Sequence, residues 1–147
     1  MWFEDFAPGQ RWETATRTVT EAEIIDFASQ WDKQSFHLDP EAARDSIFGG
    51  LIASGFHTLV ITFDLVLSMG VWNESSQGSP GMEDVRWLRP VRPGDTLKVM
   101  FEVVSVRPSS SRPDRGYVVW DHTCLNQADE PVLTFRSTGI SLRRPGA

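Results

Sequence analysis

The side chains of this sequence best suited to exchange protons near neutral pH are its three histidines, His37, His57 and His122. Asp32 precedes His37 by five positions, within residues 31–38, where no hydrophobic period is evident and we expect a loop. In an irregular loop this spacing lets both side chains turn toward one point, where a carboxylate and an imidazole can hold and deprotonate one water molecule. The alternative is two unrelated polar side chains on a surface loop.

A second candidate group lies where a long apolar segment begins, at Ser54 and Gly55. The first N–H groups of a helix have no partner within the helix and carry partial positive charge. Because glycine has no side chain, a substrate oxygen could approach the N–H of Gly55 closely, as in an oxyanion hole. The alternative is that Ser54 is an ordinary N-cap and that Gly55 serves helix packing.

The other reactive side chains favour structural roles or leave the role open. His57 falls on an expected buried helix, where a hydrogen-bonded core histidine is the more common case, whereas His122 falls on an expected strand and fits either role. Cys124 also falls on a strand, which predicts a small buried residue. Because it is the only cysteine, no intrachain disulfide can form, which is compatible with a reducing cytoplasm. Three scattered histidines and one cysteine give no metal-ligand spacing, so we expect neither a metal site nor a cofactor.

The composition is that of an acidic globular chain. Its 147 residues, 40% of them hydrophobic and 23% charged, are enough for one hydrophobic core. The net charge of −6 argues against a general nucleic-acid binder, which is usually basic, although the arginines between residues 86 and 115 could form a patch for an anionic ligand. Residues 1–5 carry no basic n-region and no apolar h-region, so we expect no signal peptide. We also expect no membrane partner, because the longest apolar stretch, residues 59–71, is too short to span a bilayer and contains Asp64.

Hydrophobic periodicity and turn signals indicate the elements that must position these residues. We expect strands at residues 10–18, 85–89, 96–107, 116–126 and 131–142. A helix at residues 21–30 begins with a capping box of Thr20 and Glu23, and Asp39 with Pro40 starts a short helix through Arg44. Residues 54–69 are apolar over most of a helix circumference, which predicts a buried helix. Together these elements indicate an α+β fold in which long antiparallel strands curl over one helix.

Two runs of the sequence resemble the MaoC-like dehydratases, the (R)-specific enoyl-CoA hydratases of the hotdog fold: WDKQSFHLDPEAA at residues 31–43 and FGGLIASGFHT at residues 48–58. A third run, VRWLRPVRPGDTL at residues 85–97, also looks like that family, although its Pro-Gly-Asp turn is shared with hotdog thioesterases. The resemblance covers nearly the whole chain. It implies one hotdog domain over residues 1–147, a curved antiparallel sheet around a long central helix, and a homodimer or a larger assembly of dimers with active sites at the interface.

The resemblance also implies an activity, the reversible syn addition of water to a trans-2-enoyl-CoA, giving a (R)-3-hydroxyacyl-CoA. Asp32 and His37 match the catalytic pair of the family, and Gly55 matches the amide that meets the thioester oxygen. The neighbouring residues expected to contact the substrate are Gln34, Phe36, Ser54 and Phe56. The sequence departs from many (R)-hydratases at Gln34 and Ser35, where Asn and Pro are usual, and at Ser54, where histidine is usual. These departures leave substrate preference open.

Two other functions remain as alternatives. A hotdog thioesterase would need a carboxylate on or near the central helix, and the only acid within that helix, Asp64, lies about 2.5 turns past Gly55. A non-catalytic acyl-CoA-binding subunit is favoured by the departures at Gln34 and Ser35. The sequence also leaves open the acyl chain length and which of Arg86, Arg89 and Arg92 would contact CoA phosphates. The polar loop at residues 73–81 is expected to line or cap the acyl tunnel.

Overall fold

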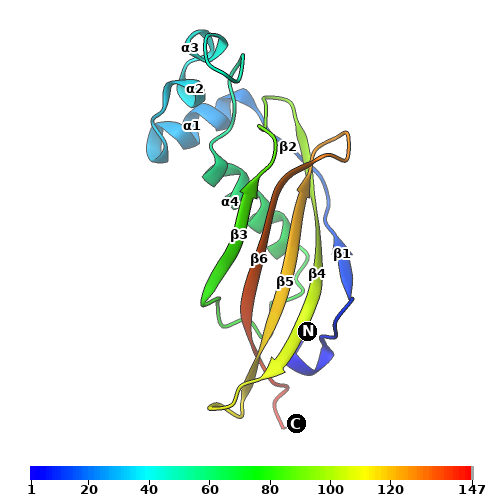
Figure 1. The fold of residues 1–147 in the computed structure, drawn as a ribbon. Helices are drawn as coiled ribbons and strands as arrows, with labels where there is room; N and C mark the ends of the chain where they lie inside the picture. Colours follow the sequence, from blue (N-terminus) through cyan, green and yellow to red (C-terminus); the bar gives the residue numbers. More distant parts are fainter. Residues whose placement is uncertain (147) are drawn as a thin grey trace.

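A computed structural model describes residues 1–146 and contains one long helix lying against a curved antiparallel sheet (Figure 1). The elements along the chain are a 3₁₀ turn η1 (Phe3–Asp5), β1 (Arg11–Glu13), β2 (Arg17–Thr18), α1 (Glu21–Trp31), α2 (Ser35–Leu38), α3 (Pro40–Arg44), α4 (Gly55–Leu67), β3 (Gly81–Trp87), β4 (Thr96–Pro108), β5 (Arg115–Leu125) and β6 (Pro131–Leu142). The expected α+β hotdog arrangement is confirmed, with α4 as the central helix.

The sheet has the strand order β1-β4-β5-β6-β3, and β2 pairs separately with β4. Along β4 as far as Val103, and along β5, every second side chain points inward and is buried, the pattern of a sheet with one face on the core. The inward residues include Val99 and Phe101 on β4 and Val118 and Trp120 on β5. A register shift between Val103 and Ser105 interrupts the β4–β5 ladder, and irregularities of this kind bend a strand locally.

Helix α4 is buried on one side only. Thr58, Ile61, Leu65 and Val66 are buried in the core. The opposite stripe remains exposed and consists of Phe56, Val60, Phe63 and Leu67. The prediction of a helix buried over its whole circumference is therefore wrong for the single chain, because the sheet covers only one of its faces.

Three sequence-based boundaries also need correction. Residues 31–38 are not one loop, because Ser35–Leu38 form α2. The strand expected at residues 10–18 is split into β1 and β2, and between them the Thr14 hydroxyl accepts a hydrogen bond from the backbone N–H of Val99, 2.9 Å away. Strand β3 begins at Gly81 rather than at residue 85. The capping box of α1, the Asp39 cap of α3 and the three long strands β4 to β6 are confirmed.

Helices α1 to α3 form a small lobe beyond the start of α4, at the end of the sheet opposite the two chain termini (Figure 1). The lobe is joined to α4 by residues 45–54, which run back from α3 to the first turn of the central helix. Side chains from α1, α2 and the start of α4 can therefore meet at one place. No helix within residues 1–146 is long and apolar enough to cross a membrane.

Candidate active site

Asp32 and His37 face each other where the lobe meets α4. Asp32 caps the C-terminus of α1, and its N–H donates to the carbonyl oxygen of Ala28 over 3.0 Å. His37 lies in α2 with its ring buried. Its Nε2 is 3.3 Å from Oδ2 of Asp32, so the structure brings together the two side chains that the sequence spacing singled out.

The second ring nitrogen determines which tautomer His37 adopts. Nδ1 lies 2.7 Å from the carbonyl oxygen of Ile52, which can only accept a hydrogen bond. Nδ1 therefore carries the hydrogen, so in the neutral ring Nε2, the nitrogen beside Asp32, can accept a proton. The Ile52 carbonyl is itself held by the backbone, since the Ile52 N–H donates to Phe36 over 3.1 Å and the Ala53 N–H donates to Val91 over 2.8 Å.

Both oxygens of the Asp32 carboxylate accept hydrogen bonds. Nε2 of Gln34 donates to Oδ1 and the hydroxyl of Ser54 donates to Oδ2, each over 2.7 Å. Burial by itself would raise the pKa of Asp32, but the two hydrogen bonds and the neighbouring His37 outweigh it, so the pKa lies below its ordinary value. The carboxylate is accordingly ionised at neutral pH.

Ser54 and Gln34, two of the expected substrate contacts, both donate hydrogen bonds to the carboxylate of Asp32. Ser54 is the N-cap of α4 by position, yet its side chain makes no capping hydrogen bond and is fully buried behind Asp32. Gln34 lines the cavity in front of the pair while its amide holds Asp32. The sequence carried no signal for the Ser54 contact, because the partner lies 22 residues earlier in the chain.

Gly55 is the first residue of α4, and its N–H has no acceptor among residues 1–146. A side chain at this position would collide with the indole of Trp87, since a Cβ would lie 2.6 Å from its Nε1. Trp87 was not among the expected site residues, although it falls in the third run of resemblance at residues 85–97, because it comes next to Gly55 only through the fold.

A cavity of about 490 Å³ opens in front of these groups. Its lining comprises Asp32, Gln34, Phe36, His37, Phe48, Ile52, Ala53, Gly55, Phe56, Thr58, Trp87, Leu88, Arg89, Pro90 and Val91. Of the three arginines considered for CoA, Arg89 lines the cavity, where it pairs with Glu130 at 2.9 Å. Loop residues 73–81 do not line it; Ser79 borders a separate apolar cavity of about 310 Å³ further along α4.

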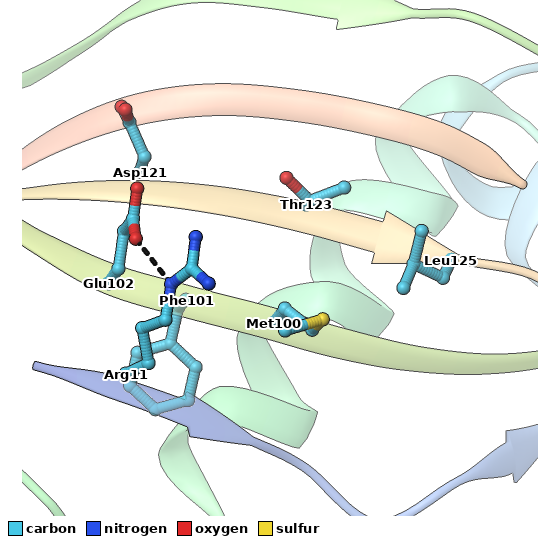
Figure 2. Close-up of a pocket in the computed structure, with 7 residues that line it drawn as sticks. All are labelled: Arg11, Met100, Phe101, Glu102, Asp121, Thr123 and Leu125. Atoms are coloured by element: carbon cyan, nitrogen blue, oxygen red, sulfur yellow. Dashed lines mark hydrogen bonds and ion pairs between the residues drawn. The ribbon is translucent and has the colours of Figure 1, made fainter. Parts of the chain in front are cut away.

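A smaller hollow of about 170 Å³ lies on the outer face of β4 and β5 (Figure 2). Nε of Arg11 on β1 pairs across it with Glu102 at 2.7 Å (Figure 2). None of the expected site residues lines this hollow. His122 does not line the cavity of the pair but the apolar cavity of about 310 Å³, stacked on Phe135 with its Nε2 3.0 Å from the Ser137 hydroxyl. The acid–base chemistry therefore has its candidate place in the cavity beside Asp32.

Comparison with known proteins shows the family of this chain. A family model described as the MaoC like domain matches residues 5–118, a span that contains Asp32, His37 and Gly55. The chain belongs to the MaoC-like family. The MaoC-like protein is similar to the crystal structure of a MaoC-like dehydratase from Rhodospirillum rubrum, with a TM-score of 0.92 and 41% identity over 99% of both chains.

Two curated relatives also match this MaoC-like chain. One is the uncharacterized protein YdeM of Bacillus subtilis (strain 168), 33% identical over 133 residues, which are 90% of this chain and 93% of the relative. The other is a mesaconyl-CoA hydratase from Haloarcula hispanica, 31% identical over 82% of this chain. The match covers 35% of that hydratase, so the chain spans about a third of its length.

Proposed function

We propose that the MaoC-like protein is a cytoplasmic hydratase and dehydratase of acyl thioesters that adds water reversibly to a trans-2-enoyl-CoA and forms a (R)-3-hydroxyacyl-CoA. The proposal rests on one observation: Nε2 of His37 lies 3.3 Å from the ionised Asp32 in a cavity that Gly55 also lines, and the Gly55 N–H has no acceptor within residues 1–146. The mesaconyl-CoA hydratase among the relatives supports hydration of a thioester as the reaction class.

In the hydration direction, a water molecule held between Asp32 and His37 attacks Cβ of the enoyl thioester. The lone pair on Nε2 of His37 takes one proton of that water, and the carboxylate of Asp32 stabilises the imidazolium that forms. The π electrons move toward the thioester oxygen, whose developing charge meets the N–H of Gly55. The pair then returns a proton to Cα on the face from which the water came, which makes the addition syn.

The structure also bears on the two alternative functions. Asp64, the carboxylate a thioesterase would use, does not line the cavity; its side chain is 70% exposed and lies 3.7 Å from Arg17. Gln34, the departure that favoured a non-catalytic subunit, donates to Asp32 and keeps the carboxylate charged. Both observations favour the hydratase.

Two features of the surface support a homodimer as the working form. The exposed stripe of α4, made of Phe56, Val60, Phe63 and Leu67, is a contiguous apolar face of the kind that marks an interaction surface. Strand β3 beside it lies at the edge of the sheet and can pair with a second strand. We propose that a second copy of the chain covers this stripe and adds its own β3 to the free edge.

The test is a pair of assays on one substrate. With crotonyl-CoA we expect the enoyl absorbance to fall as the double bond is hydrated and no free thiol to appear. Thiol release without loss of the double bond would instead identify a thioesterase. Binding of crotonyl-CoA with neither change would identify the non-catalytic subunit and overturn the proposal.

A further inference from the structure

We infer that Trp87 is a positioning residue for the amide of Gly55, an inference that builds on the proposed function. Trp87 is the last residue of edge strand β3, and its indole N–H donates to the carbonyl oxygen of Gly55 over 2.9 Å. The two residues are 32 positions apart in the chain. The contact joins the sheet directly to the first turn of α4, where the expected oxyanion donor lies.

The indole, rather than the backbone conformation, is the reason that residue 55 must be glycine. The backbone of Gly55 is outside the left-handed region that favours glycine. A Cβ at this position would lie 2.6 Å from Nε1, 2.7 Å from Cε2 and 3.1 Å from Cδ1 of Trp87. Since all three atoms belong to one rigid ring, the clash could be relieved only by moving the whole indole.

An anchor is needed because glycine is the most flexible residue and stands at the least constrained end of the helix. An amide contributes to an oxyanion hole only if it is oriented before charge develops. Two contacts fix Gly55 from opposite sides along the chain. The preceding residue, Ser54, is tied to Asp32 by its hydroxyl, and the Gly55 carbonyl is tied to Trp87 by the indole.

Trp87 is itself well placed to act as this anchor. It is paired with Leu133 of β6 in the sheet, and the next N–H, that of Leu88, donates to Val132 over 2.9 Å. The ring of Phe56 packs edge-on against the indole, with centroids 6.1 Å apart. The sheet therefore fixes the position of the indole, and the indole fixes the position of Gly55, whose N–H is the expected oxyanion donor. Trp87 also lines the cavity, so its side chain would lie close to a thioester bound there.

The first test replaces Trp87 with phenylalanine, which keeps an aromatic ring but removes the N–H donor. We expect kcat for crotonyl-CoA hydration to fall about tenfold, the effect of roughly one weakened hydrogen bond on a positioned donor, with KM changed less than threefold. Trp2→Phe, a matched change at the far end of the sheet, should leave both constants unaltered. A Trp87→Phe enzyme with wild-type kcat would overturn the inference.

A double-variant cycle tests the steric half of the inference. Gly55→Ala should lower the thermal unfolding temperature by several degrees, because its methyl group collides with the indole. In the Trp87→Ala background the obstacle is gone, so the same change should lower the unfolding temperature much less, while activity stays low because the anchor is missing. An equal decrease in both backgrounds would show that the indole is not the reason for the glycine.

A third measurement does not depend on turnover, so it separates this inference from the proposed function. In Trp87→Phe we expect the NMR order parameter of the Gly55 N–H to fall below its wild-type value, because the residue is no longer held in one orientation. An unchanged order parameter would contradict the anchoring role. A wild-type protein that hydrates no enoyl thioester would refute the proposed function, while the order parameters would still decide the role of Trp87.

Discussion

The hydroxyl of Ser54 donates to Oδ2 of Asp32 over 2.7 Å and thereby links the start of α4 to the end of α1. The serine stands at the cap position of its helix but serves a carboxylate instead of the helix amides. On the other side of the same carboxylate, Gln34 donates to Oδ1 over 2.7 Å. Of the three residues at which this chain departs from many (R)-hydratases, Gln34 and Ser54 are thus both hydrogen-bonded to Asp32.

The first prediction concerns the acid–base pair. Asp32→Asn removes the charge that would stabilise the imidazolium, and His37→Asn removes the base, so each should reduce crotonyl-CoA hydration at least about a hundredfold. Thermal unfolding should still show a cooperative transition. Asp64→Asn is the matched control, because this exposed carboxylate lies outside the cavity, and it should hydrate as fast as the wild type. Full activity in either pair variant would reject the assignment.

The second prediction concerns the support of Asp32. Ser54→Ala removes a hydrogen bond to a charged group, which is worth about 1.5–3 kcal/mol. We expect kcat to fall roughly tenfold or more and the pKa of Asp32 to move up toward its ordinary value. Ser75→Ala is a matched control, since Ser75 is equally buried and its hydroxyl has no hydrogen-bond partner within residues 1–146. If both serine variants behaved alike, the link between Ser54 and catalysis would be refuted.

The third prediction concerns the pH dependence of stability. Burial lowers the pKa of His122 to about 4, against a smaller opposing effect of Asp121. In the unfolded chain the pKa returns to about 6.5, so between these values the unfolded state binds more protons than the folded state. The free energy of unfolding should therefore fall as the pH drops through this window, by about 2 kcal/mol between pH 7 and pH 5.

Urea denaturation of His122→Phe tests whether His122 causes this pH dependence of the free energy of unfolding. Phenylalanine can stack on Phe135 and Phe101 as the imidazole does, but it cannot take up a proton. The variant should lose most of the decrease in stability between pH 7 and pH 5. A remainder is expected from His57, whose pKa burial also lowers. An unaltered pH profile would mean that another group is responsible.

The fourth prediction concerns the proposed dimer. Sedimentation should give twice the 16.6 kDa mass of the chain. Phe63→Glu places a charge in the apolar stripe of α4 and should shift the protein toward the monomer. Ile47→Glu is the control, because Ile47 is 96% exposed but lies outside that stripe. A wild-type monomer, or a Phe63→Glu variant that stays dimeric, would contradict the proposed interface.

Prediction from sequence succeeded where local chemistry decides the outcome. The Thr20 and Glu23 capping box, the Asp39–Pro40 helix start and the period of β4 and β5 each depend on residues a few positions apart. It failed at α2, which is only four residues long. It also failed at the outer stripe of α4, because an apolar pattern does not distinguish a buried face from one left open by a single chain.

The sequence by itself determined the family resemblance and the candidate pair, because Asp32 and His37 are close enough in the chain for one short segment to carry both. Only the tertiary structure decided what surrounds them. Ser54 reaches Asp32, Trp87 covers Gly55 and the Ile52 carbonyl selects the His37 tautomer through contacts between residues 15 to 32 positions apart. Such contacts depend on how sheet and helix pack, and no spacing or period in the chain encodes that packing directly.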